Sequence, residues 1–342
     1  MSDTYKINQP KASLEAVDIA KFIASVLIFS RHCHVILGFN NLWLTEFLSH
    51  WGVPFFFICS SYFLFSKSKN GQLGSAVRKY ISRIGALYAV WFVYNLPNVF
   101  FVRLYPENLA EITTWLGFIK NSILSSTFTG SWYLASSIFS AFLIYVLSKK
   151  FSTKIILCFT FVFYLFCVFS SAYGNLFPSF TQVLRMFCFP LNIFNGLFYF
   201  AVGKYICENK EKIEKVFTQK KALLCFLVFY LLYGLEIQLA EYFKFYSWSD
   251  VAFCTVLMSS SLFLFCMQAK VHIEKPLLLR KLSIIIFCCQ GNVLLVNSFC
   301  KKMLGYSAMI SYFISMFIIA VICVFVLYMQ KRSSAKWVQA LT

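Results

Sequence analysis

The residue types best suited to chemistry gather in one apolar stretch, VDIAKFIASVLIFSRHCHV, which starts at Val17. It contains Asp18 and Lys21, and two of the four histidines of the chain, His32 and His34. A histidine titrates near neutral pH and can therefore accept a proton from a hydroxyl group as a general base. A lysine supplies a positive charge for an anionic group. The stretch thus predicts a site that combines proton transfer with anion binding.

Helical spacing groups four of these polar residues into one stripe. At 100° per residue, one helix face carries Asp18, Lys21, Ser25 and His32. Such a stripe is costly in lipid, so we expect it to face a protein interior or a wet cavity. There His32 either takes part in function or hydrogen-bonds a neighbouring helix. Arg31 and His34 point elsewhere, and we interpret them as structural or interfacial.

The element that carries the stripe belongs to a membrane bundle. Of 342 residues, 60% are hydrophobic and only 13% are charged, against about 25% charged in soluble domains. Apolar stretches of bilayer-spanning length recur along the chain. The sequence predicts an all-α, polytopic transmembrane bundle forming a single domain over residues 1–342. The ten expected spans are 19–39, 51–66, 84–102, 131–148, 155–173, 187–203, 222–240, 250–267, 282–299 and 307–328. An interfacial helix is allowed within 103–130.

The distribution of positive charge predicts the orientation. Of the 31 Lys and Arg residues, 24 fall on the side of the two termini, six fall on the opposite side, and Arg31 lies within a span. This bias predicts that both termini, segments 1–18 and 329–342, face the cytoplasm. The net charge of +18 therefore reflects topology and predicts no nucleic-acid partner. The thirteen cysteines show no metal-ligand spacing and are interpreted as packing residues.

Five stretches resemble the bacterial integral-membrane acyltransferases known as acyltransferase family 3. AVDIAKFIASVLIFSRHCH is similar to the first helix of the family, with Lys21 and His32 at its basic and histidine positions. VRKYISRIGALYAVW resembles the basic start of the third helix, with Arg83 at its most recognisable position. The other matching stretches are WGVPFFFICSSYFLF, GSWYLASSIFSAFLIY and FNGLFYFAVGKYI. In the ninth helix many members carry Ser, Tyr and His, whereas this chain has Ser283, Phe287 and Gln290.

The resemblance implies an enzyme of the bacterial cytoplasmic membrane. It implies an O-acyltransferase that moves an acyl group, most readily acetyl from acetyl-CoA, to a hydroxyl of a surface polysaccharide or its lipid-linked precursor. It implies no cofactor beyond this cosubstrate, and no metal is expected. The resemblance implies neither a particular acceptor glycan nor a particular oligomeric state.

We expect two catalytic residues and a set of substrate-binding residues. His32 is the expected general base, and Glu236, late in the seventh span, is a candidate second acid or base. Asp18 is expected to pair with Lys21. The expected substrate-binding residues are Lys21, Asp18, Arg83, Ser25, Trp132, Tyr133, Ser283 and Gln290.

Three alternatives stay open on the sequence alone. The acyl group can pass directly to the acceptor or be carried by His32. Intramembrane ionisable residues also suit a proton-coupled transporter or exporter of small solutes. A third reading is a membrane module that supplies a small molecule for cell-wall modification.

Overall fold

The computed structural model of the chain describes residues 15–38, 48–67, 72–104, 112–247 and 251–342. Within these ranges the secondary structure is helical and no β-strand occurs, so the predicted all-helical class is confirmed. Most of the expected cytoplasmic segment 1–18 lies outside the described residues.

Fifteen α-helices and one π-helical segment follow one another in the described ranges. Their bounds are α1 Glu15–Leu37, α2 Gly52–Phe65, α3 Leu73–Tyr94, α4 Leu96–Asn98, a π-helical segment Val99–Leu104, α5 Ile112–Leu124, α6 Ser131–Leu147, α7 Thr153–Ser170, α8 Pro178–Met186, α9 Asn195–Glu208, α10 Lys210–Val216, α11 Gln219–Tyr242, α12 Phe253–Gln268, α13 Pro276–Leu304, α14 Ala308–Arg332 and α15 Lys336–Gln339.

Five helices in the described ranges are long and apolar enough to cross a membrane, namely α1, α7, α11, α13 and α14. Three shorter apolar helices, α2, α6 and α12, coincide with further expected spans. Each of the ten expected spans overlaps a helix. The number ten and the cytoplasmic position of both termini stay predictions.

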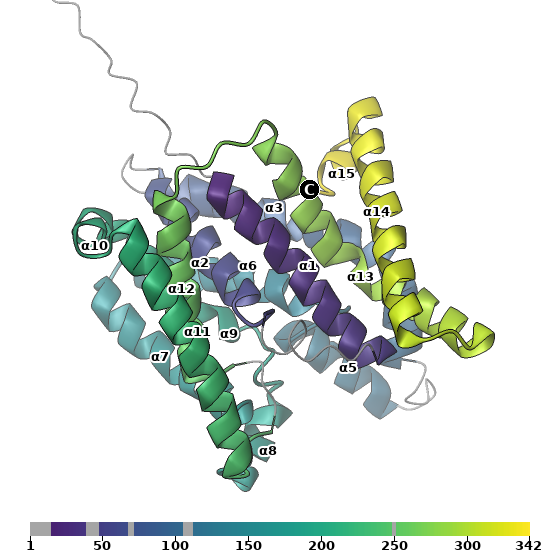
Figure 1. The fold of residues 1–342 in the computed structure, drawn as a ribbon, viewed down its shortest axis with the longest axis horizontal. Helices are drawn as coiled ribbons and strands as arrows, with labels where there is room; N and C mark the ends of the chain where they lie inside the picture. Colours follow the sequence, from purple (N-terminus) through teal and green to yellow (C-terminus); the bar gives the residue numbers. More distant parts are fainter. Residues whose placement is uncertain (1–14, 39–47, 68–71, 105–111, 248–250) are drawn as a thin grey trace, which may run out of the picture.

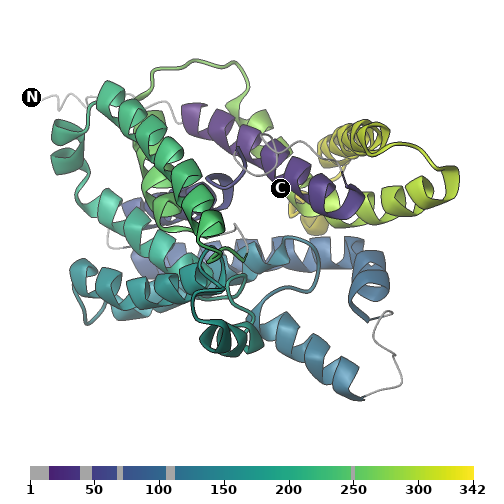
Figure 2. The same ribbon diagram turned by 60° about the horizontal axis from the view of Figure 1, so that its bottom comes forward.

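Helix α1 occupies the middle of the bundle. Figure 1 shows α1 crossing the centre of the view, with α11 and α12 on one side and α13 and α14 on the other. It packs along α13 and also contacts α2, α12 and α14. Figure 2 shows the α11–α12 pair and the α13–α14 pair from a second direction, again with α1 between them. The polar stripe of α1 is thus placed in the interior, as its sequence predicts.

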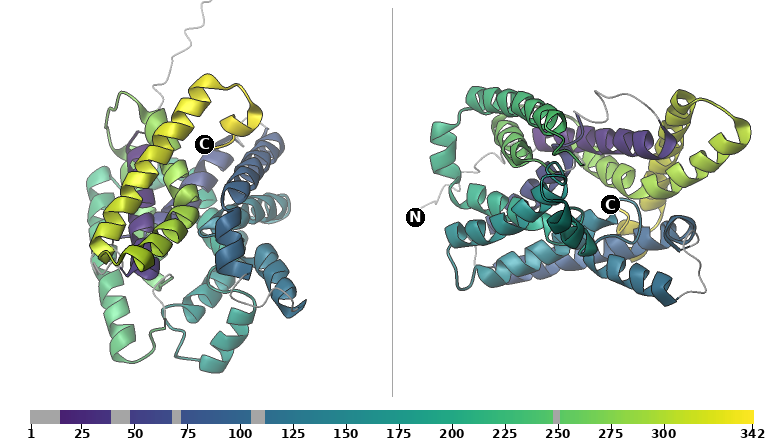
Figure 3. Two further views of the ribbon diagram at one scale, coloured as in Figure 1. Left: turned by 90° about the vertical axis from the view of Figure 1, so that its right-hand side faces the viewer. Right: turned by 90° about the horizontal axis from the view of Figure 1, so that it is seen from below.

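The α2–α9 and α3–α6 pairs complete the bundle. The right-hand panel of Figure 3 shows α5 at the edge of the molecule. Helices α2 and α9 approach closely at Gly203, where an added Cβ would lie 2.5 Å from the carbonyl oxygen of Ile58. Only glycine fits at that contact, and small residues at helix interfaces allow such close backbone packing in membranes.

The starts of two expected spans differ most from those of the observed helices. Helix α3 begins at Leu73 rather than at 84, so Arg78, Lys79 and Arg83 lie on a helix and not in a loop. The expected span 187–203 is helical only from Asn195. Pro190 explains this late start, because it lacks an amide hydrogen and restricts the residue before it.

Candidate active site

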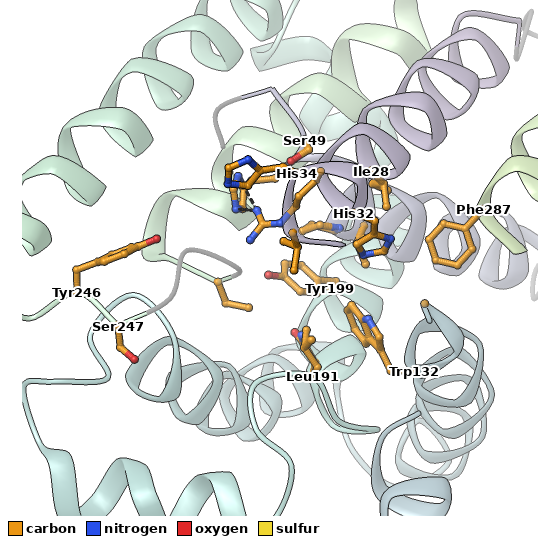
Figure 4. Close-up of a pocket in the computed structure, with 18 residues that line it drawn as sticks. Ile28, His32, His34, Ser49, Trp132, Leu191, Tyr199, Tyr246, Ser247 and Phe287 are labelled. Carbon is orange, nitrogen blue, oxygen red and sulfur yellow. Dashed lines mark hydrogen bonds between the residues drawn. The ribbon is translucent and has the colours of Figure 1, made fainter. Parts of the chain in front are cut away.

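His32 lies at a cavity of about 460 Å³, which we call the His32 cavity. Three of the four histidines of the chain line it, His32, His34 and His50. Figure 4 shows His32 beside Phe287 at one edge of the cavity, with Trp132 below them. The imidazole of His32 thus faces a protein cavity rather than the surface of the bundle.

Gln290 orients the imidazole of His32. The Nδ1 atom of His32 lies 2.8 Å from Oε1 of Gln290, which is fully buried on α13. The amide nitrogen of Gln290 donates to the carbonyl of Phe287 at 2.8 Å, and this second bond fixes which amide atom faces the histidine. Since an amide oxygen only accepts, Nδ1 carries the proton in the neutral ring and Nε2 carries the lone pair. Nε2 is therefore the atom able to accept a proton.

A second cavity of about 460 Å³ surrounds the opposite end of the α1 stripe, and we call it the Lys21 cavity. Its described charged lining residues are Asp18, Lys21, Lys67, Lys79, Arg83 and Arg280. Five cations thus face one carboxylate. Lys21 and His32 are eleven residues apart, which is about 16 Å along the helix axis.

The predicted pair between Asp18 and Lys21 is wrong, because Asp18 pairs with Arg280 instead. Its carboxylate, 2% exposed, accepts two hydrogen bonds from the guanidinium of Arg280, at 2.8 and 3.1 Å. Lys21 instead places its ammonium 5.7 Å from the ring centre of Phe63. Within the described ranges, no carboxylate lies at ion-pair distance from Lys21 or Arg83. These two cations are therefore available to an anion.

A small pocket of about 120 Å³ lies between the two cavities, and we call it the middle pocket. Lys21, Ser60, Arg83 and Arg280 line both this pocket and the Lys21 cavity. Phe287 lines both this pocket and the His32 cavity. The three spaces thus follow one another along α1.

The predicted substrate-binding residues distribute over these spaces. Trp132 lines the His32 cavity, while its neighbour Tyr133 lines the middle pocket. Ser283 also lines the middle pocket, where its hydroxyl donates to the carbonyl of Arg280. Ser25 is fully buried and its hydroxyl donates to the carbonyl of Phe22. Ser25 lines none of the three spaces, so its predicted role in substrate binding has no support in the geometry.

Glu236 lies away from this site. It lines a separate cavity between α11 and α12 that shares no lining residue with the His32 cavity. Its carboxylate accepts hydrogen bonds from the backbone amides of Phe253 and Cys254, at 2.7 and 2.9 Å, and from the hydroxyl of Tyr173 at 3.2 Å. The carboxylate therefore satisfies the first amides of α12, which have no partner within the helix. We assign Glu236 a structural role instead of a catalytic one.

Replacing Glu236 by glutamine tests this assignment. We expect the free energy of unfolding to fall by about 1 kcal/mol, because a neutral amide is a weaker acceptor for helix N-terminal amides than a carboxylate. The catalytic rate per folded molecule is expected to stay within about twofold of wild type. A loss of rate of about 100-fold, the size typical of a lost acid or base, would contradict the structural role. Chemical unfolding in detergent and an acyl-transfer assay measure the two effects.

Several residues of the site are not predicted from the sequence. Arg280 was counted only as a loop cation, although it holds the buried carboxylate of Asp18. Asn195 and Tyr199, one helical turn apart on α9, line the His32 cavity. Among the described residues, Asn195 Oδ1 is buried without a hydrogen-bond partner, so it is suited to contact a bound molecule, whereas the Tyr199 hydroxyl lies near those of Thr255 and Tyr164. No group of three metal-ligating side chains occurs in the described part of the chain.

Comparison with known proteins adds independent information. The sequence model of a family described as "Acyltransferase domain", acyltransferase family 3, matches residues 14–329. Two proteins of Enterococcus faecalis, both named amino-acid racemase, are similar to the chain. One is 25% identical over 243 residues, 67% of this chain and 32% of the relative. The other is 24% identical over 337 residues, 93% of this chain and 46% of the relative. The chain thus spans less than half the length of these relatives. No solved structure matches the chain.

Proposed function

The chain belongs to acyltransferase family 3, and from this premise we propose that it is a membrane O-acyltransferase that transfers an acetyl group from acetyl-CoA to an acceptor hydroxyl. The proposed acceptor is a cell-surface polysaccharide or its lipid-linked precursor. The proposed location is a bacterial cytoplasmic membrane, with the Lys21 cavity open toward the cytoplasm, where the Lys and Arg residues of the loops gather.

The single observation that carries the proposal is the order of the three spaces along α1. A cationic cavity, a small pocket and a cavity around an oriented histidine follow one another and share lining residues. This order matches the parts of an acyl-CoA, whose phosphates need cations and whose acyl group must reach a base and an acceptor.

The Lys21 cavity suits the phosphates of the donor. Arg83 and Lys21 are unpaired among the described residues and both also line the middle pocket. A guanidinium forms paired hydrogen bonds with phosphate oxygens, whereas an ammonium acts as a point charge. Arg83 is accordingly the main proposed phosphate contact, with Lys21 beside it.

His32 acts as the general base in the proposed reaction. The acceptor hydroxyl gives its proton to Nε2 of His32 while its oxygen forms a bond to the thioester carbonyl carbon. The carbon–sulfur bond then breaks, and the leaving sulfur of CoA takes the proton from the imidazolium. The ester and free CoA are the products. Gln290 is a positioning residue, because its hydrogen bond holds His32 in the tautomer that this step requires.

Two measurements test the proposed function. Membranes containing the protein, incubated with acetyl-labelled acetyl-CoA and candidate glycans, are expected to transfer the label to the glycan. Mass spectrometry of surface glycans is expected to show the loss of an acetyl increment when the gene is removed. Absence of label transfer, together with an unchanged glycan mass, would overturn the proposal.

Replacing Arg83 by glutamine tests the donor site. We expect KM for acetyl-CoA to rise about 10- to 150-fold, which corresponds to the roughly 1.5–3 kcal/mol of a hydrogen bond to a charged group. The KM for the acceptor is expected to stay near the wild-type value. Arg78→Gln is the matched control, because Arg78 is exposed on the same helix and lines neither donor space. Equal effects of the two substitutions would contradict a specific role for Arg83.

The names of the relatives favour a second candidate function. Both similar proteins are named amino-acid racemase, and a module attached to such an enzyme could handle an amino acid or another small molecule for wall modification. Sealed vesicles that take up labelled amino acids, with no dependence on acetyl-CoA, would favour this candidate over acyl transfer.

A further inference from the structure

Phe287 occupies the only position shared by the middle pocket and the His32 cavity among their described lining residues. The middle pocket continues in the other direction into the Lys21 cavity through four shared residues. A group that travels from the cations to His32 therefore meets the ring of Phe287 last.

Two further aromatic rings hold Phe287 in place. Its ring centre lies 5.4 Å from that of Tyr133 and 6.1 Å from that of Phe56, and both contacts are edge-on. The rings of Phe56 and Tyr133 lie 5.9 Å apart, so the three form a closed triangle. Edge-on aromatic pairs of this spacing are mutually stabilising. We call this set the aromatic partition.

The backbone of Gly130 lies close to the ring of Phe287. Gly130 adopts a φ of +84°, and a Cβ added there would lie 3.5 Å from Cζ of Phe287 and 3.0 Å from the amide nitrogen of Gln290. A glycine therefore suits both the backbone conformation and the close approach to Phe287 and Gln290. Gln290 is in turn bonded to both Phe287 and His32, so the partition and the base form one connected unit.

The middle pocket is small, and its wall near the partition is apolar. Its volume is about 120 Å³, against about 460 Å³ for each neighbouring cavity. The apolar lining residues are Phe56, Ile84, Leu87, Leu134, Ile284 and Phe287. An apolar recess attached to a cationic cavity suits the short acyl end of a donor whose phosphates stay at the cations.

We propose that Phe287 is a specificity-determining residue that limits the donor to short acyl chains and must turn aside before the acyl carbon reaches His32. This inference rests on the proposed acyl-CoA-dependent function and adds to it the residue that selects the acyl chain. One additional methylene in a hydrophobic site is worth about 10- to 200-fold in discrimination. The ring is thus expected to disfavour hexanoyl against acetyl donors.

The experiment compares donors of different chain length. Purified full-length protein in detergent is titrated calorimetrically with acetyl-CoA and hexanoyl-CoA, and kcat/KM is measured with both. Phe287→Leu is expected to raise the hexanoyl-to-acetyl ratio of kcat/KM about tenfold or more. Phe287→Met, which keeps the volume but adds flexibility, is a second variant in case the first does not fold, with a smaller rise in the same direction.

Phe263→Leu is the matched control, since Phe263 is fully buried on α12 and lines none of the three spaces. The hexanoyl-to-acetyl ratio of kcat/KM in this variant is expected to equal that of wild type. The proposed role of Phe287, but not the proposed function, would be overturned by either of two results. One is an unchanged hexanoyl-to-acetyl ratio of kcat/KM in folded Phe287 variants that still bind acetyl-CoA, and the other is an equal rise of this ratio in Phe263→Leu. Wild-type protein that binds neither donor would overturn the proposed function itself, and with it the proposed role of Phe287.

Discussion

Replacing His32 by alanine is expected to lower kcat for acyl transfer by about 100- to 10,000-fold, the contribution typical of a general base. The physical reason is that Nε2 of His32 is the proposed proton acceptor, in a ring that the hydrogen bond from Nδ1 to Gln290 orients. The KM for acetyl-CoA is expected to change little, because the cations proposed to bind the donor lie about 16 Å away along α1. Steady-state kinetics with labelled acetyl-CoA separate the two parameters.

His272→Ala is the matched control for this experiment. Its side chain is 89% exposed, and it lies 3.5 Å from Glu15, near the start of α1 rather than at the His32 cavity. It is expected to keep the wild-type rate. Added imidazole is expected to restore part of the activity of His32→Ala, since a small base can enter the open cavity. Full activity of His32→Ala would show that another group takes the proton.

The polar stripe of α1 was predictable from the sequence because it depends only on helical periodicity. Lys21 and His32 lie on one helix at a spacing that the sequence fixes. The cost of such residues in lipid then predicts an interior position. The structure places Lys21 and His32 at two cavities along α1. Phe287, which lies between the middle pocket and the His32 cavity, is visible in the sequence only as a departure from the family pattern, and nothing in the sequence places it between two cavities.

The partners of the ionisable residues were not predictable, because they come from distant parts of the chain. Asp18 and Arg280 are 262 residues apart in sequence, and local spacing favoured Lys21 as the partner instead. Glu236 similarly binds amides 17 and 18 residues away, at the start of the next helix. A buried carboxylate in a span indicates that a partner exists, but only the packing of the helices identifies it.

The departure from the family pattern at Gln290 became interpretable only in three dimensions. In sequence it marks a histidine that is missing from the ninth helix. In the structure Gln290 lies against His32 and donates to the carbonyl one turn earlier, at Phe287. A glutamine keeps the hydrogen-bond acceptor for Nδ1 without adding a second titratable group.

Replacing Arg280 by alanine is expected to lower the free energy of unfolding by about 2–4 kcal/mol. The substitution leaves the carboxylate of Asp18, which is 2% exposed, without its two hydrogen bonds. Removing one partner of a buried ion pair costs about 3–5 kcal/mol, and the lower figure here reflects a guanidinium that is 45% exposed. Thiol labelling during chemical unfolding measures the effect, because the chain has many buried free cysteines that react only after opening.

Because Asp18 is buried and Arg280 is half-exposed, we expect the loss of stability to differ according to which of the two residues is replaced. Asp18→Asn is expected to cost less than Arg280→Ala, because it leaves a half-exposed guanidinium that water can solvate, and not a buried charge. The double variant Asp18→Asn/Arg280→Gln is expected to recover part of the loss, since two neutral amides can hydrogen-bond to each other. Arg83→Gln is the control, because Arg83 lines the same cavity without an ion pair among the described residues, and its stability is expected to match wild type. Equal costs for Asp18→Asn and Arg280→Ala would mean that water or another group reaches Asp18, and that the ion pair does not hold α1 to α13.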